Sequence, residues 1–295
     1  MKTEQDEYLG YVTSSESSRE WVENLEDYVE HVLEGKVDYI DEKNTSLFVK
    51  RSEVLLIVFE SAQEVLRRNN ARLPTAWEIA CAENWSYLAV VSELPGWPQG
   101  GAIAAYFSEL KARRSLDHFT SVVLLGIKGG SGAAYLSGQH FKNATAVIIQ
   151  PESVAKPDEQ SVAYEYQQPL SNFSDAGTKL IVAHDPLVQG APPFLSLADI
   201  EIRCRHFGTK TDQFLRAFEV TPKLLKMAVN DTYNELEIYQ LLRKRKHFRS
   251  YWRNVLSKID LNQRPWLATV LCQNVLRLLG GKKFREALKV IDQSS

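Results

Sequence analysis

One stretch of the sequence decides the fold: Ser121-Val122-Val123-Leu124-Leu125-Gly126-Ile127-Lys128-Gly129-Gly130-Ser131-Gly132. Its first part is an apolar, partly β-branched run that is typical of a buried strand. A glycine-rich turn follows, and the small residues Ala133-Ala134-Tyr135-Leu136 then open a helical pattern. The stretch therefore predicts a strand, a tight exposed turn and a helix in direct succession.

Further apolar runs share the composition of this strand. They lie at residues 54–59, 87–91, 145–149, 179–183 and 200–204. Helical patterns lie between most of them, at residues 75–83, 103–114 and 132–138. Strands that alternate with helices at this spacing predict an α/β fold with a mostly parallel sheet and helices on both faces. The run at 200–204 alternates more than the others, so we expect it near an edge of the sheet.

The two ends of the chain differ from this core. Residues 1–42 carry thirteen acidic and three basic side chains. There we expect a loosely attached start over residues 1–13 and one helix over residues 20–33. Helical patterns dominate after residue 210, where residues 236–246 predict a helix and residues 265–279 and 282–291 predict a helical hairpin.

These patterns predict three parts and one long connection. We expect an acidic N-terminal segment at 1–45, an α/β core at 46–210 and C-terminal helices at 211–295. Residues 151–178 show no clean period and are rich in Glu, Gln, Ser and Pro. That composition predicts a long loop or a small lid within the core.

The composition narrows the classes of function. The chain has 295 residues, a formal net charge of −2 and ordinary hydrophobic (44%) and charged (24%) contents, so it predicts no general attraction to nucleic acid or to anionic membranes. Its cysteines, Cys81, Cys204 and Cys272, form no C-x-x-C pair. We therefore expect no disulfide and no structural zinc. No apolar run is long enough to span a bilayer and the acidic start is no signal peptide, so we expect a cytoplasmic protein.

The basic run at residues 243–249 has two interpretations. It forms either a solvated face or a docking surface for an anionic partner. Phe248, Tyr251 and Trp252 lie within or beside it, and aromatic side chains among basic ones can bind single-stranded nucleic acid. No nucleic-acid fold signature accompanies them, so we do not expect nucleic-acid binding.

The turn after the central strand has the spacing of a nucleophile elbow. Such an elbow reads G-x-S-x-G, with the serine exposed above the sheet. The same frame here reads Gly126-Ile127-Lys128-Gly129-Gly130, so Lys128 takes the place of the nucleophile. In enzymes of this kind an acid and then a histidine follow later strands. Asp185 and His206 occupy those places in the order of the chain. Because ligands collect at the carboxyl ends of parallel strands, these side chains predict a shared pocket.

Lys128 has three possible roles. A desolvated lysine at a helix start can act as a nucleophile or base. Its ammonium can instead bind an anion together with the amides of Gly129, Gly130 and Ser131. In the simplest case it is a solvent-directed side chain beside glycines that allow a strand and a helix to pack closely.

The remaining candidates each have a second explanation. Ser131 fits a relaxed G-x-S-x-A frame as a nucleophile, but it also suits the start of a helix as a cap. Glu60 follows the first buried strand, where oxyanion donors are expected, and a carboxylate there would repel a developing oxyanion. Two histidines and one carboxylate, the side chains of His184, Asp185 and His206, resemble a set of metal ligands. Adjacent strand residues point to opposite faces, so we expect no metal site.

Between residues 54 and 259 the sequence resembles a family of bacterial α/β-hydrolase-like proteins of unassigned activity. The residues that carry the resemblance are Leu56-Ile57-Val58-Phe59-Glu60, Ala76-Trp77, Asn84-Trp85-Ser86, Ala105-Tyr106-Phe107, Gly126, Gly129-Gly130, Asp185-Pro186-Leu187 and Arg203-Cys204-Arg205-His206. The resemblance implies an α/β-hydrolase-like sheet and an elbow without serine, which Lys128 matches. Some members carry the name phosphosulfate reductase, but this chain lacks the active-site cysteine and the phosphosulfate loop of such an enzyme.

Three functions remain open at this stage. The first is an atypical or catalytically inactive member, a pseudoenzyme, that binds a small anionic or acyl ligand or a protein partner near Lys128, Gly129, Gly130 and Glu60. The second is an active serine-type hydrolase that uses Ser131 or Lys128 with Asp185 and His206. The third is an interaction scaffold that acts through its terminal helices. None of them requires a cofactor.

Overall fold

The computed structural model describes residues 4–67, 72–93, 101–150, 178–186, 195–205, 215, 218–260 and 263–294. The chain forms two compact units. The first comprises residues 1–184, 191–202 and 224–233, and the second comprises residues 185–190, 203–223 and 234–295. The loop or lid predicted at 151–178 lies outside the described residues, except for residue 178.

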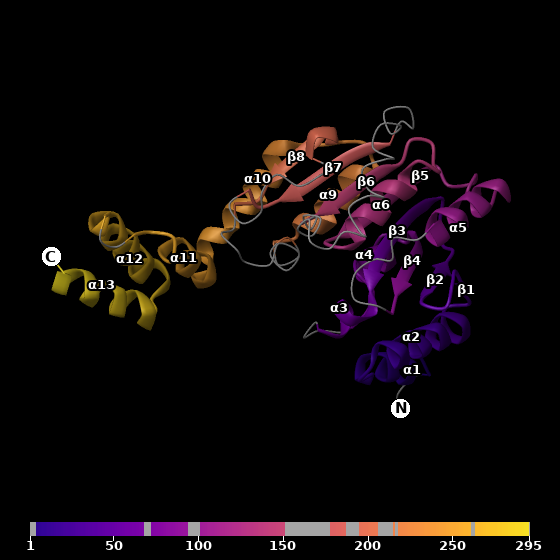
Figure 1. Ribbon diagram of the computed structural model, residues 1–295, viewed down its shortest axis with the longest axis horizontal. Coiled ribbons are helices and arrows are strands. Elements are labelled where there is room, and N and C mark those ends of the chain that lie inside the picture. The colour runs from indigo at the N-terminus through magenta and orange to yellow at the C-terminus, as the bar shows by residue number, and fades with distance from the viewer. Residues whose placement is uncertain are drawn as a thin grey trace. The chain divides into compact units, whose positions relative to one another are not determined.

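The first unit is built on a sheet of eight strands in the order β1-β2-β4-β3-β5-β6-β7-β8 (Figure 1). Their bounds are β1 Lys36–Tyr39, β2 Asn44–Val49, β3 Val54–Ser61, β4 Ser86–Ser92, β5 Ser121–Ile127, β6 Thr145–Ile149, β7 Lys179–His184 and β8 Ile200–Arg203. The strands β1 and β2 pair antiparallel to each other, and β2 pairs antiparallel to β4. The pairs from β4 through β3, β5 and β6 to β7 are parallel. A mostly parallel sheet with this order, surrounded by helices, is α/β-hydrolase-like, as the sequence predicts.

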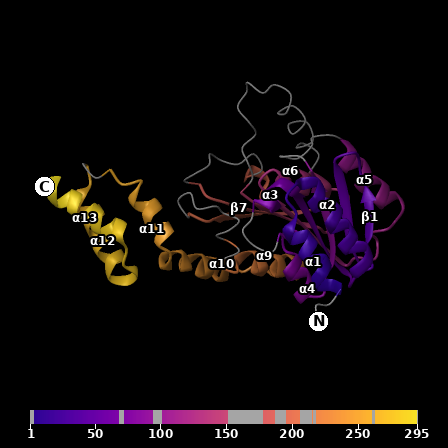
Figure 2. The same cartoon turned by 90° about the horizontal axis from the view of Figure 1, so that it is seen from below.

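The central strands are buried on both faces because they are continuous apolar runs. Every residue of β4 and β6 is buried, and so are all but the first residues of β3 and β7. Strand β8 is less buried and lies at the edge, which confirms the expectation from its alternating pattern. Helix α6 (Gly130–Gly138) packs on β3, β5 and β6. Figure 2 shows α6 and α9 (Val220–Val229) on opposite sides of the sheet.

Three further helices and a 3-10 turn belong to the first unit. They are α3 Ala62–Leu66, α4 Trp77–Ala82 and α5 Gly101–Ala112, with a 3-10 turn at Leu195–Leu197. The ring of Phe107, on α5, is fully buried and lies 5.9 Å from the ring of Phe59 on β3. Helix α5 therefore covers the same core that α6 covers.

The N-terminal segment is more ordered than the sequence predicts. Residues 4–14 form helix α1 (Glu4–Ser14), although we expected a loose start there. Its Val12 is fully buried and its Tyr8 ring stacks on His31 at 6.0 Å, so tertiary packing holds a segment with little helical pattern of its own. The expected helix at 20–33 is α2 (Ser18–Asp27), which continues as a π-helical turn over Tyr28–Val32.

The second unit contains the C-terminal helices. They are α10 Glu235–Leu242, a 3-10 turn at Arg243–His247, α11 Arg249–Leu256, α12 Pro265–Leu279 and α13 Lys282–Ser294. The expected helix at 236–246 ends at Leu242, where a run of like charges begins. Helices α12 and α13 form the predicted hairpin around a core of Cys272, Val275 and Phe284.

Candidate functional site

Lys128 occupies the turn between β5 and α6, as the sequence predicts. Its φ angle is +51°, a left-handed conformation that non-glycine residues rarely adopt. Its backbone N–H donates to the carbonyl oxygen of Ile149 at 3.0 Å, and its own carbonyl accepts from Ser131 N–H at 3.0 Å. A fixed backbone in this strained region is typical of functional turns.

Gly126 allows this turn to be tight. A Cβ atom at this position would lie 2.7 Å from Ala134 Cβ, from the Gly130 carbonyl oxygen and from Ser131 Cα. The first turn of α6 therefore lies directly on the last part of β5. This contact aims the start of α6 toward the carboxyl end of the sheet.

Glu64 holds the side chain of Lys128. The Lys128 ammonium lies 3.2 Å from Glu64 Oε1, and the two side chains are 24% and 31% exposed. Glu64 belongs to α3, which directly follows β3, the strand beside β5. No motif in the sequence singles out Glu64, although its place just beyond a central strand is a signal for it.

Ser131 lies in the first turn of α6 and not at the elbow. It is 1% exposed, and its hydroxyl has no hydrogen-bond partner within the described part of the chain. Gly129 precedes the helix with helical backbone angles, and no side chain caps this helix start. The expected capping role of Ser131 is therefore absent, while its role as a nucleophile stays a prediction.

Glu60 has a structural role in β3. It is 4% exposed, and its two oxygen atoms accept hydrogen bonds from Thr75. The Thr75 backbone N–H donates at 2.8 Å and the Thr75 hydroxyl at 2.6 Å. This carboxylate fastens the segment before α4 to the sheet, and its predicted contact with a ligand stays a prediction.

Asp185 and Lys128 belong to different compact units, so the pocket that they are predicted to share stays a prediction. Asp185 is 1% exposed and belongs to the second unit, whereas Lys128 belongs to the first. Burial, and then the charge of Asp185, raise the pKa of the Cys204 thiol well above its usual range. His206 lies outside the described residues, so the proposed order Lys128, Asp185, His206 stays a prediction.

A second pair of titratable side chains lies at the end of β7. His184 is 2% exposed, and its Nε2 atom lies 2.8 Å from Glu201 Oε1 on β8. The other ring nitrogen, Nδ1, is buried and has no hydrogen-bond partner in the described ranges. The sequence pattern presents His184 only as a candidate metal ligand. Its contact with Glu201 depends on the proximity of β7 and β8, which no motif in the sequence reports.

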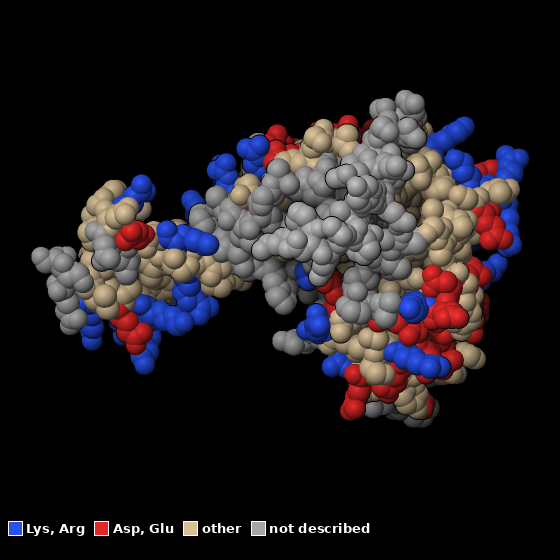
Figure 3. Space-filling model, in the orientation of Figure 1, with Lys and Arg blue, Asp and Glu red and all other residues tan. Residues whose placement is uncertain are grey.

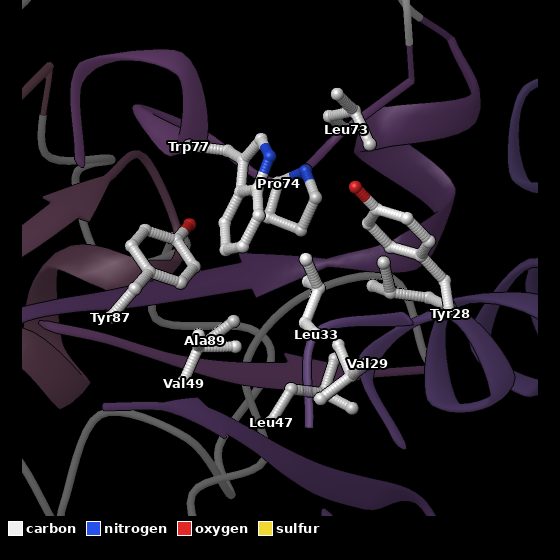
Figure 4. A pocket seen from close by; sticks show the side chains of 11 residues that line it. Tyr28, Val29, Leu33, Leu47, Val49, Leu73, Pro74, Trp77, Tyr87 and Ala89 are labelled. Carbon is white, nitrogen blue, oxygen red and sulfur yellow. The ribbon is translucent and has the colours of Figure 1, made fainter. Parts of the chain in front are cut away.

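Two pockets lie away from the elbow. One is an apolar gap of about 10 Å³ between α2, the π-helical turn and strands β2 and β4 (Figure 4), lined among others by Tyr28, Val29 and Trp77. It has room for about one water molecule and no polar lining, so it is a packing gap.

The second pocket is an open groove of about 540 Å³. Carboxylates line most of it: Glu23, Glu26, Asp41, Glu42 and Glu93.

The groove lies in an acidic part of the first unit. Figure 3 shows acidic side chains gathered over the region of α1, α2 and β1. Burial is the main cause that raises the pKa of Glu26, while hydrogen bonds from Tyr39 and Thr45 lower it by a smaller amount.

Within the described ranges, no group of three or more His, Cys, Asp or Glu side chains could hold a metal ion. No helix in those ranges is both long and apolar enough to cross a membrane.

Comparison with known proteins gives limited similarity. No protein-family model matches the sequence, and no curated protein is similar to it. Among solved structures, a sugar hydrolase from Lactococcus lactis is similar over 68% of this chain and 100% of its own, with 12% identity and a TM-score of 0.41. An α/β hydrolase from a deep-sea metagenome library is similar over 66% of this chain and 98% of its own, with 10% identity and a TM-score of 0.40. Any functional assignment therefore depends on this chain's own residues.

Proposed function

We propose that this chain is an atypical α/β-hydrolase-fold protein that binds a small anionic or acyl ligand at the turn between β5 and α6. Lys128 carries the proposal because it combines a strained, hydrogen-bonded backbone with a partly exposed basic side chain. The ligand's negative group would contact this ammonium and the amides of Gly129 and Gly130. The positive end of the α6 dipole adds to the attraction.

The ion pair with Glu64 supports binding more than covalent chemistry. An ammonium group has no lone pair with which to attack a carbonyl carbon. Glu64 also holds the side chain in place while leaving about a quarter of it exposed. A ligand anion would share the ammonium with Glu64, so the carboxylate weakens binding and at the same time preorganises the site.

Titration with simple anions tests this proposal. We expect inorganic phosphate or butyrate to bind the wild-type chain, as measured by calorimetry, and Lys128→Ala to remove the binding. Glu64→Gln should strengthen it several-fold because the competing charge is lost. Lys142→Ala, at an exposed lysine beyond α6, is the matched control and should bind like the wild type. Equal affinity in Lys128→Ala and the wild type would exclude this site.

A serine-type hydrolase is the second candidate, and the buried, unpaired hydroxyl of Ser131 is the observation in its favour. A fluorophosphonate probe and p-nitrophenyl butyrate should then react with the wild type. Ser131→Ala and His206→Ala should both lose the reaction. Inert wild-type protein would remove this candidate.

A protein partner on the C-terminal helices is a further candidate. Trp266 is 68% exposed, Leu278 67% and Val290 53%, which is unusual for large apolar side chains. If these residues form a docking face, pull-downs should lose the same proteins in Trp266→Ala and in a chain lacking residues 260–295. Proteins retained by Trp266→Ala would argue against this face.

A further inference from the structure

The side chains of His184 and Glu201 form a polar pair that is not part of the proposed anion site. His184 ends β7, where its ring is nearly fully buried and Glu201 Oε1 lies 2.8 Å from Nε2. Along β7, Leu180 and Val182 belong to the cluster that Tyr135 of α6 covers. Since strand residues two apart share a face, His184 lies on the same covered face, beyond Val182.

The contact with Glu201 determines what the other nitrogen offers. A carboxylate can only accept hydrogen bonds, so Nε2 carries the proton that points to Glu201. In the neutral ring Nδ1 then has a lone pair and acts as an acceptor. This atom is buried without a partner in the described ranges. A buried polar atom without a hydrogen-bond partner costs free energy. We therefore expect a bound molecule to supply the missing donor.

The sheet register places His184 in one row with Lys128. Ile127 pairs with Ile149, and Ile149 pairs with Ala183, on neighbouring parallel strands. The residues that follow them are Lys128, Gln150 and His184.

The backbone confirms that this row is continuous. Lys128 N–H donates to Ile149 at 3.0 Å, and Gln150 N–H donates to Ala183 at 2.8 Å. Neighbouring strands lie about 4.8 Å apart, so the Cα atoms of Lys128 and His184 are about 10 Å apart across two spacings.

We propose that His184 Nδ1 accepts a hydrogen bond from a hydroxyl group of the ligand whose anionic group binds Lys128. The ligand class is a small hydroxylated anion, such as the phosphate ester of a short diol. Glu201 holds the imidazole in the accepting tautomer. This inference rests on the proposed function of Lys128, and it adds the second recognition point along the row of strand ends.

The chemistry of the site favours a hydroxyl over other groups. In the neutral ring Nδ1 is an acceptor and needs a donor, so a second carboxylate or a fully ionised phosphate group, which can only accept, does not fit. A cationic donor would have to give up its hydration at a position with less than 1 Å² of exposed surface. A water molecule offers the same O–H donor as an alcohol, so the test must separate these two sources.

Two matched series of probes make this separation. The first contains n-alkyl phosphates with about three to six carbons, a range that covers the spacing between the strand ends. The second contains the same phosphates with a terminal hydroxyl. Calorimetry with the full chain should show about tenfold tighter binding for the best hydroxylated probe than for its alkyl counterpart, as expected for one added hydrogen bond.

His184→Phe is the decisive variant because phenylalanine fills a similar volume without a polar atom. It should bind both series equally, with the affinity that the wild type has for alkyl phosphates. Glu201→Gln should also reduce the preference, because a side-chain amide no longer fixes the tautomer. Since either variant can misfold, nitrogen NMR of wild-type His184 gives an independent readout. The Nδ1 resonance should move with the hydroxylated probe and not with the alkyl probe.

The outcomes distinguish the inference from the proposed function. If both series bind the wild type equally, the occupant of Nδ1 is water only and the inference is wrong, while the anion site at Lys128 stands. If neither series binds, the anion site fails and the inference fails with it. A hydroxyl preference that persists in His184→Phe, or a Nδ1 resonance that does not move, would also overturn it.

Discussion

Gly126 sets how closely α6 approaches the sheet. A Cβ atom there would lie 2.7 Å from two backbone atoms and one Cβ, none of which can rotate away. Gly126→Ala should therefore lower the free energy of unfolding by about 1–3 kcal/mol, measured by urea denaturation. Gly10→Ala in α1 is the matched control. Its Cβ would meet nothing within 4 Å, and alanine should stabilise the helix by about 0.5–1 kcal/mol. Equal effects of the two substitutions would contradict the tight contact.

Tyr106 makes the stability of the first unit sensitive to alkaline pH. Burial raises the pKa of Tyr106 from 10.0 to about 12, and its hydroxyl lies 2.7 Å from Ser46 Oγ. Above pH 10 the unfolded chain loses this proton while the folded chain keeps it, so ionisation favours unfolding until about pH 12. Below pH 10 the group adds no pH dependence.

Tyr106→Phe should remove this contribution. The wild type should lose up to about 2 kcal/mol more than the variant between pH 10 and pH 12, in urea denaturation at each pH. Parallel curves for the two proteins across this range would show that the hydroxyl of Tyr106 ionises equally well in the folded state.

The sequence predicts the residue at the turn but not the partners of its side chain. The glycine spacing around Lys128 locates the elbow because glycine is needed where a helix lies on a strand. By contrast, Glu64 and Glu201 reach Lys128 and His184 only because neighbouring strands bring them together. Such contacts depend on strand order, which periodicity along a single chain does not encode.

At the scale of elements, Glu60 fastens the start of α4 to β3. Thr75→Val keeps the shape of the side chain but removes the hydroxyl that donates to Glu60 at 2.6 Å. Hydrogen bonds to charged groups are stronger than neutral ones, so we expect a loss of about 1.5–3 kcal/mol in unfolding free energy. Thr232→Val, at an exposed position, should change it by less than about 0.5 kcal/mol. If Thr75→Val lowers the free energy of unfolding no more than Thr232→Val does, then water replaces the hydrogen bond between Thr75 and Glu60.

Elements with strong periodicity are predicted well, and those that depend on packing are not. The buried strands and the helices α12 and α13 appear where the sequence places them. Helix α1 was missed because its own helical pattern is weak and it is held by tertiary contacts such as those of the buried Val12. The helix predicted over 236–246 is too long because the basic residues after Leu242 have good helix propensity, so the sequence does not show where the helix ends. In the structure residues 243–247 form a 3-10 turn instead, as is frequent at the end of an α-helix.

At the scale of the whole molecule, charge is divided between the two ends of the chain. Residues 1–42 hold thirteen acidic and three basic side chains, whereas residues 243–295 hold three acidic and thirteen basic ones. The net charge of −2 conceals this division. Salt should therefore affect the two units separately, because each repels itself through like charges.

Because each unit has its own core, damage to one should leave the other folded. Phe284 is 1% exposed and joins α13 to Cys272 and Val275 of α12. Phe284→Ala should cost about 3–5 kcal/mol locally, enough to open a small helical core. Hydrogen exchange should then accelerate in residues 249–294, while the amides of β3, β5 and β6 keep wild-type protection.

Trp266→Ala is the matched control, since this side chain is 68% exposed on the same hairpin and its loss leaves no cavity. Its exchange should equal that of the wild type. Faster exchange in the strands of the Phe284→Ala protein would show that the two units fold as one cooperative body, because the sheet would then draw stability from the C-terminal helices. Unchanged exchange in α12 and α13 would show instead that Phe284 contributes little to their core.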